Sequence, residues 1–253
     1  MGRTCTPIAT DLESESGLAW RPPRASRAAL PLETQRLRLE ALSPAHCSAF
    51  HAAISASAAH LRPWVSMSRQ FHATEEDTAE WIRANMPRDD EACDGDGDAD
   101  AAGAGTAPRQ LQLVIVRRDT GELIGGIGIL RIEPLVAAGE LGFWLAQSHC
   151  GHGFATEASR ATVTHAFDTV NGLGLRRVCM VVAAPNVASL RVAQKLGFPL
   201  EGHARGRFWS PGIGVVDSAE FGVLAEEWDA SAGRARAGVG RQRPPPPVLS
   251  GTW

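Results

Sequence analysis

Two glycines, Gly151 and Gly153, stand directly before a segment that predicts a helix from about Phe154. Glycine lets the backbone adopt positive φ angles and lets a ligand come close to the main chain. The first amide N–H groups of a helix have no partner inside the helix, and the helix dipole adds partial positive charge there. Residues 150–156 contain no acidic side chain. We therefore predict that this turn binds a phosphate-bearing ligand.

A second helix with clear end signals follows later in the chain. Asn186 is suited to cap its start, because the side-chain oxygen can accept a hydrogen bond from a first-turn N–H. Gly197 is suited to the position just past its end, and Phe198 supplies the apolar contact that often follows. Ser189 places a hydroxyl in the first turn.

Strands and helices must alternate to position these residues. Residues 139–145 predict the strand that leads into the glycine turn, and the apolar run 177–182 has the length of a buried strand. Hairpins are predicted within 111–132 and 201–224. The sequence thus predicts the α/β (α+β) class, a mixed sheet flanked by helices.

The N-terminal half predicts one strand and two helices. Residues 33–42 alternate polar and apolar side chains, which is typical of a half-buried strand. Ser43-Pro44 predicts the start of a helix that runs to about Ser57. Thr74 predicts a second helix start, with Asp77 in the capping-box position.

Composition sets the outer limits. The 253 residues suffice for one domain, which we place at 32–229. We expect a disordered leader at 1–31 before it and an Arg/Pro-rich disordered tail at 230–253 after it. Within the domain, we expect residues 89–108 to form an acidic flexible insert. The net charge of −3 argues against a nucleic-acid partner. Five scattered cysteines favour a reducing, cytoplasmic setting, and no apolar run is long enough to span a membrane.

Three weaker patterns do not predict sites. The glycines of 125–128 do not have the spacing of a dinucleotide loop, so we expect a bulge or close backbone packing there. The acidic residues of 94–98 lack the later glycine and glutamate of a calcium loop. His149 and His152 have no further metal ligands nearby in sequence, so we expect them to face solvent and expect no metal.

The stretch 139–198 resembles the GNAT superfamily of N-acetyltransferases, and most closely its Rim-type branch. The family's pyrophosphate loop reads Gln/Arg-x-x-Gly-x-Gly/Ala, and Cys150, Gly153 and Ala155 stand at its defined positions. The first of these departs from the pattern. Asn186-x-x-Ser189 is the second family hallmark. The resemblance implies a GNAT-like acyl-CoA acyltransferase fold with a mostly antiparallel central sheet.

The resemblance also implies acetyl-CoA as cosubstrate. Its pyrophosphate would lie on the main chain of the loop, and backbone N–H groups near Trp144 and Leu145 would face the oxyanion. Asn186 would contact the pantetheine arm, although its side chain is also explained by capping alone. The implied cofactor-binding residues are Trp144, Leu145, Cys150, Gly151, His152, Gly153, Phe154, Ala155, Thr156 and Asn186. Because Cys150 lies near a helix N-terminus, we expect its thiol pKa to be lowered.

Two residues are implied as catalytic. Glu140 matches a position where many family members carry a general base or a carboxylate that holds water; it is equally explained as a solvated strand residue. Many members protonate the leaving thiolate with tyrosine, which this chain lacks, so Ser189 would donate instead, unless it is only a first-turn residue. The helices of 44–86 would form one wall of the acceptor groove. There Trp64 and Phe71 could contact the acceptor, although we favour buried packing for both.

These readings predict an acetyl-CoA-dependent N-acetyltransferase that acts by direct attack in a ternary complex, as a monomer or homodimer. The acceptor is a primary amine, and a protein N-terminal α-amine is favoured. A small amine, such as an antibiotic, polyamine or amino acid, stays open. So does a catalytically weak acyl-CoA-binding module.

Overall fold

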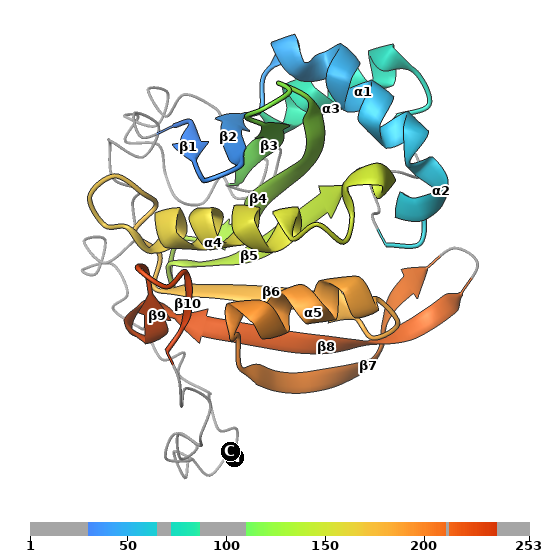
Figure 1. Cartoon of the computed structure of the whole chain (residues 1–253). Helices are drawn as coiled ribbons and strands as arrows, with labels where there is room; N and C mark the ends of the chain where they lie inside the picture. Colours follow the sequence, from blue (N-terminus) through green and yellow to red (C-terminus); the bar gives the residue numbers. More distant parts are fainter. Residues whose placement is uncertain (1–29, 65–71, 87–109, 211–212, 237–253) are drawn as a thin grey trace, which may run out of the picture.

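The computed structural model describes residues 30–64, 72–86, 110–210 and 213–236 (Figure 1). Strands β1 to β8 form one sheet in the order β1-β2-β3-β4-β5-β6-β8-β7. None of the described helices is both long and apolar enough to cross a membrane. The elements are β1 Leu32–Glu33, β2 Leu37–Ala41, the 3₁₀ turn η2 Pro44–His46, α1 Cys47–Ala56, α2 Ala58–Leu61, α3 Glu75–Asn85, β3 Leu111–Arg117, β4 Leu123–Glu133, β5 Ala138–Leu145, η5 Gln147–His149, α4 Phe154–Phe167, β6 Arg177–Ala183, α5 Val187–Leu196, β7 Leu200–Ser210, β8 Gly214–Leu224, η6 Ala225–Glu227, β9 Trp228–Asp229 and β10 Arg234–Ala235.

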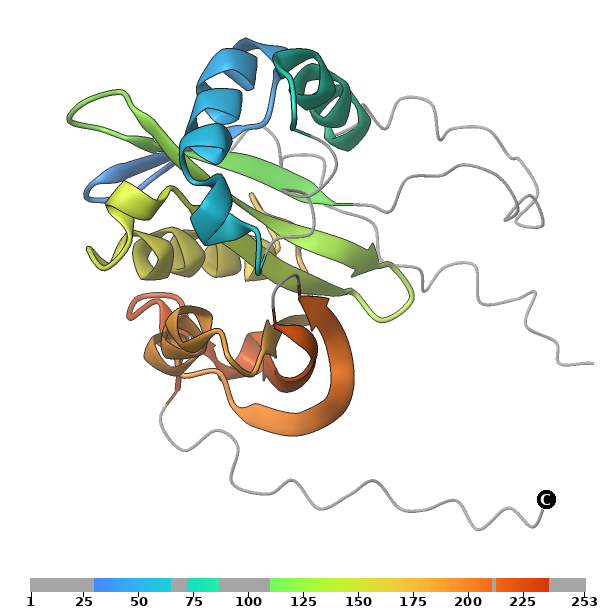
Figure 2. The same ribbon diagram turned by 90° about the vertical axis from the view of Figure 1, so that its right-hand side faces the viewer.

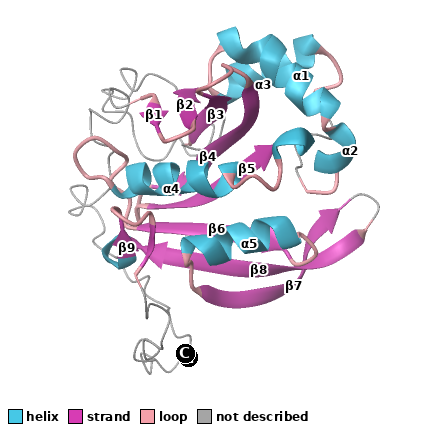
Figure 3. Ribbon diagram, viewed as in Figure 1, coloured by secondary structure: helices cyan, strands magenta, loops and turns pink. Residues whose placement is uncertain are grey.

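Helices cover both faces of the sheet, and each face has its own apolar core. Helices α4 and α5 lie side by side and run in the same direction, so that both begin at one end of the sheet (Figure 1). Their core includes Leu113, Ile127 and Leu141. Helices α1 and α3 pack on the other face with Val114 and Trp144 (Figure 2). The predicted α/β class, with a mostly antiparallel sheet between helices, is confirmed (Figure 3).

Among the described strands, β5 and β6 form the single parallel junction of the sheet, and this junction is short. Only residues 138–140 of β5 pair with 177–179 of β6, although both strands continue for several residues beyond. The two strands therefore diverge after Glu140 and Cys179. The edge of β5 that faces β6 has no strand partner beyond that point in the described chain.

Local signals explain most of the element boundaries. Thr74 and Asp77 form the predicted capping box at α3, the Asn186 side chain caps α5, and Gly197 ends α5 with a φ of 72°. The glycines of β4 are explained by close packing, as expected: a Cβ on Gly126 would lie 2.6 Å from the Trp144 indole nitrogen.

The predicted strand over residues 33–42 is wrong as one element. The chain turns at Thr34–Arg36, and β1 folds back antiparallel on β2. This turn is stabilised by a hydrogen bond from the Leu37 N–H to the Thr34 hydroxyl. At the other end, regular structure continues past the expected domain boundary near residue 230, because β10 pairs with β9 and Ala235 is buried. The predicted acidic insert and Phe71, together with most of the predicted leader and tail, lie outside the described residues.

Candidate active site

The glycine turn has the backbone conformation that the sequence requires of it. Gly151 and Gly153 both have a φ of 84°, and Gly153 is the N-cap of α4. The side chains of Phe154 and Thr156 are buried, at 7% exposure each. The N–H groups of residues 151–156 donate to no other described residue, whereas the Glu157 N–H already bonds to the Gly153 carbonyl. Apart from the exposed His152 side chain, the turn therefore presents mainly main-chain donors to a ligand.

A carboxylate inside the helix fixes this turn to a distant part of the chain. Glu157 accepts hydrogen bonds from the Thr34 hydroxyl at 2.7 Å and from the Arg36 N–H at 2.9 Å, and it pairs with the Arg36 guanidinium. The same guanidinium donates to the His152 carbonyl at 3.0 Å and lies 4.5 Å from the centre of the Phe154 ring. Burial raises the pKa of Glu157, but these hydrogen bonds outweigh it and leave the pKa lowered.

The expectation of a lowered thiol pKa at Cys150 is wrong. Burial raises its pKa, because the half-buried thiol is partly removed from water. The Sγ atom lies 3.5 Å from Nε2 of His60 in α2 and 3.6 Å from the Ala146 carbonyl oxygen. The thiol thus packs toward α2 and is a weak nucleophile here.

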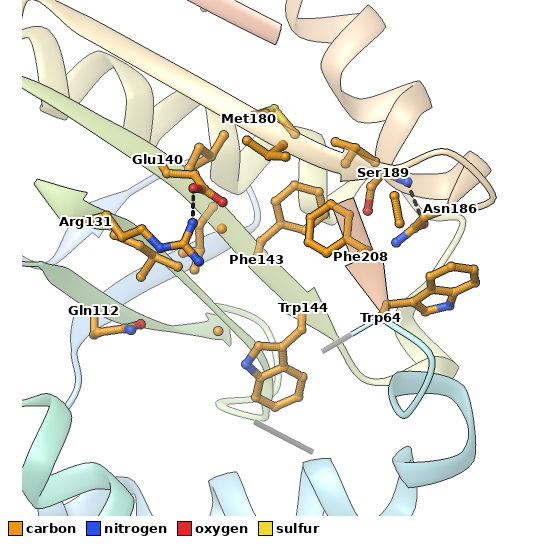
Figure 4. Close-up of a pocket in the computed structure, with 18 of the residues that line it drawn as sticks. Trp64, Gln112, Arg131, Glu140, Phe143, Trp144, Met180, Asn186, Ser189 and Phe208 are labelled. Atoms are coloured by element: carbon orange, nitrogen blue, oxygen red, sulfur yellow. Dashed lines mark hydrogen bonds and ion pairs between the residues drawn. The ribbon is translucent and has the colours of Figure 1, made fainter. Parts of the chain in front are cut away.

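A cavity of about 330 Å³ occupies the gap where β5 and β6 diverge (Figure 4). Its floor comes from Glu140 to Trp144 of β5 and from Met180 to Ala183 of β6. Helix α5 contributes Asn186 and Ser189, and β7 contributes Phe208 to Ser210. The cavity thus lies between the diverging strands and is lined from both faces of the sheet.

Aromatic side chains form the wall on the α1/α3 side. Phe50 lies edge-on to Trp144, with ring centroids 5.1 Å apart, and stacks on Trp81 at 5.5 Å. Trp64, at the end of the α2 segment, is half-buried and lines the cavity. The preference for buried packing therefore does not hold for Trp64, which is available to a bound molecule.

The two predicted catalytic residues, 49 positions apart in the chain, line the same cavity. Glu140 lies on one side, next to Arg131, and Ser189 lies on the other, next to Asn186 (Figure 4). Phe143 and Phe208 lie between them in this view. The Glu140 side chain is 18% exposed and forms an ion pair with Arg131. A group bound between these two sides can reach a carboxylate and a hydroxyl.

The pairing of β4 with β5 shows which amides of β5 face the gap. The Ala146 N–H bonds to the Ile124 carbonyl at 2.8 Å, and the register pairs Trp144 with Gly126. Because N–H directions alternate along a strand, the Trp144 N–H is directed to β4, whereas those of Phe143 and Leu145 are directed to the gap. The N–H groups of Phe143 and Leu145 are therefore the ones that face the gap, and the Trp144 N–H does not.

Asn186 and Ser189 are joined at the start of α5. The Asn186 Oδ1 accepts a hydrogen bond from the Ser189 N–H at 3.1 Å. This bond uses the side-chain oxygen of Asn186 and leaves its amide NH₂ and the Ser189 hydroxyl at the cavity wall. Both residues therefore combine a structural role with access to a ligand.

Of the two histidines expected to face solvent, only His152 does so. His152 is exposed as predicted, but His149 is buried at 8% exposure, with Nε2 3.1 Å from a Glu122 carboxylate oxygen. The expectation of a solvent-facing His149 is wrong because η5 turns its ring toward the β3–β4 hairpin. Among the described residues, no group of three His, Cys, Asp or Glu side chains could hold a metal ion.

Sequence reasoning missed three residues of the site. Phe143 could have been found from strand alternation, because it lies between Leu141 and Leu145. Arg36 had no site signal of its own, because its contacts with His152 and Glu157 join segments far apart in the chain. Arg131 had no local signal, because its position depends on an irregularity in the pairing of β4 with β5.

Comparison with known proteins identifies the family. A family model described as "Acetyltransferase (GNAT) domain" matches residues 36–199. A putative ribosomal N-acetyltransferase, YdaF of Bacillus subtilis, is 32% identical over 109 residues, which cover 43% of this chain and 57% of that protein. The ribosomal-protein-serine acetyltransferase of Escherichia coli is 41% identical over 81 residues, which cover 32% and 44%. The chain thus matches only about half the length of these curated relatives.

Solved structures confirm the fold. RimL, described as a ribosomal α-N-protein acetyltransferase and solved with coenzyme A, superposes with a TM-score of 0.63 at 22% identity, over 77% of this chain and 97% of RimL. Mycobacterium smegmatis RimJ, solved with a CoA disulfide, gives a TM-score of 0.63 at 24% identity, over 78% and 86%. At these identities the likeness concerns the fold alone.

Proposed function

Since the chain belongs to the GNAT acetyltransferase family, we propose that it transfers an acetyl group from acetyl-CoA to a primary amine, with a protein N-terminal α-amine as the acceptor class. The observation that carries the proposal is the row of main-chain N–H groups at residues 151–156, which have no partner among the described residues and lie at the end of the divergent strands β5 and β6. The ribosomal acetyltransferases among the relatives support the acceptor class.

The residues of the loop fit a diphosphate. Six consecutive main-chain N–H groups lack a partner in the described chain, and the dipole of the fourteen-residue α4 adds partial positive charge. Such a site depends on backbone geometry, so the loss of the family's Gln/Arg at Cys150 is tolerable. The gap between β5 and β6 then receives the pantetheine arm, with Asn186 and the N–H groups of Phe143 and Leu145 along it.

The chemistry follows from the groups on the two sides of the cavity. The acceptor nitrogen attacks the thioester carbonyl carbon, a C–N bond forms, and the C–S bond breaks. Glu140 accepts the proton that the amine loses, directly or through water. The Phe143 N–H, which faces the gap, stabilises the oxyanion, and the Ser189 hydroxyl donates a hydrogen bond to the departing sulfur. An α-amine has a pKa near ~7.7–8.0, so a carboxylate base is sufficient.

A peptide panel tests the proposal. Release of CoA thiol is followed with acetyl-CoA and peptides that carry either a free α-amine or a blocked N-terminus and one lysine, and mass spectrometry locates the acetyl group. We expect α-amine products only. Glu140→Gln should lower kcat by about 100-fold or more while CoA affinity stays unchanged. CoA binding without release for any amine would favour the acyl-CoA-binding module instead.

A further inference from the structure

Arg131 occupies a strained position at the rim of the cavity. It has a φ of 48°, which non-glycine residues rarely adopt, and it lies where the pairing of β4 with β5 shifts between Leu130 and Glu133. A β-bulge of this kind redirects side chains and is common next to active sites. Here it brings the guanidinium onto Glu140 while the Arg131 side chain stays 70% exposed.

Arg131 and Glu140 are the charged residues among the described residues that line the cavity. The other lining groups are aromatic, aliphatic or uncharged polar side chains, such as Gln112 and Ser210. A bound amine is therefore met by one carboxylate and one guanidinium in direct contact with each other. The Arg131 charge opposes a second positive charge on the acceptor and favours a negative one.

We propose that Arg131 is a specificity-determining residue that binds an acceptor carboxylate close to the reacting amine, such as an acidic side chain at the second position of a peptide. This inference rests on the proposed acetyltransferase function. A guanidinium offers a planar fork of donors that matches a carboxylate. When the acceptor carboxylate takes this fork, Glu140 is released to hold the amine.

The exchange costs little free energy, because one carboxylate partner of Arg131 is replaced by another. The Arg131 side chain is largely in water, where an ion pair adds little stability, so its contact with Glu140 can open. Without an acceptor carboxylate, the guanidinium stays on Glu140 and occupies the carboxylate that would otherwise contact the amine. Acidic acceptors are thus selected both by contact and by release of the base, and polyamines are disfavoured.

The test uses two peptides that differ only by aspartate or asparagine at the second position. With saturating acetyl-CoA, we expect wild-type kcat/KM for the aspartate peptide to be about tenfold higher. Arg131→Ala should remove this preference, so that kcat/KM becomes equal for the two peptides, and Arg131→Lys should keep part of it. Arg38→Ala is the matched control, because Arg38 pairs with Glu40 outside the cavity.

Binding of the same two peptides to the CoA-saturated protein, measured by calorimetry, tests Arg131 without turnover. A preference for the aspartate peptide that Arg131→Ala abolishes supports the inference even if no acetyl group is transferred, in which case only the proposed function fails. Equal binding of both peptides by the wild type would overturn it. So would an Arg131→Ala variant that keeps the preference.

Discussion

The two sides of the candidate active site differ in the groups that form them: main-chain groups on the cofactor side and side chains on the acceptor side. On the cofactor side, residues 151–156 offer main-chain N–H groups; two of these residues are glycines, and the Phe154 and Thr156 side chains are buried. On the acceptor side, the cavity is lined by side chains from α1, α3, five strands, α5 and the segments that join them, among them Trp64, Glu140 and Ser189. A site made of backbone tolerates changes in side chains, whereas a site made of side chains changes its specificity with each of them.

This difference decides which mutations matter on each side. Cys150 replaces a family glutamine or arginine, yet the cradle beyond it keeps its geometry, with both glycines at a φ of 84°. On the acceptor side, one strained residue, Arg131, supplies the positive charge among the described lining residues. We expect backbone changes to abolish cofactor binding and side-chain changes to alter turnover or acceptor choice.

The largest effect is expected from Gly153→Val. A β-branched residue at a φ of 84° is strongly strained, so the turn must rearrange and its N–H groups lose their common direction. We expect the dissociation constant for CoA to rise at least about 100-fold by titration calorimetry. Gly121→Val is the control, because Gly121 has a φ of 71° with open space around it in the β3–β4 turn. An unchanged dissociation constant for Gly153→Val would show that the cradle does not hold the cofactor.

The same difference explains how much the sequence reveals. The cradle could be predicted because glycine and helix-start signals are local, and Asn186 and Gly197 were found as caps for the same reason. The acceptor side depends on register and on contacts between distant segments. The bulge that redirects Arg131, the burial of His149 and the orientation of Cys150 toward His60 are therefore not visible in any short stretch of sequence.

Ser189→Ala should have a smaller effect, confined to turnover. Loss of one hydrogen bond to the departing sulfur should lower kcat about tenfold, with CoA affinity and stability nearly unchanged. Asn186→Ala provides the contrast, because its side-chain oxygen caps α5 and its loss should lower the free energy of unfolding by about 1 kcal/mol. Stopped-flow rates and urea unfolding measure the two quantities. If Ser189→Ala lowered stability but not kcat, Ser189 would be only a first-turn residue.

The smallest effect concerns the wall of the acceptor side and its dependence on pH. His72 is buried at 8% exposure, and its ring lies 5.8 Å from the Phe50 ring and 5.4 Å from the Trp81 ring. Its pKa is lowered to about 4, mainly by burial and also by nearby His51, whereas Asp77 opposes the shift. In the unfolded chain the pKa is near ~6.5, so between these values only the unfolded state binds the proton. Stability must therefore fall as the pH falls from about 6.5 toward 4.

At pH 5.5 this linkage should cost on the order of 1 kcal/mol of unfolding free energy relative to pH 7.5. His72→Gln removes the titrating group and should reduce the difference between the urea midpoints at the two pH values. His152→Gln is the control, because His152 is exposed and should leave that difference unchanged. If His72→Gln kept the full pH dependence, protonation of His72 in the unfolded chain would not be the cause of the loss of stability in mild acid.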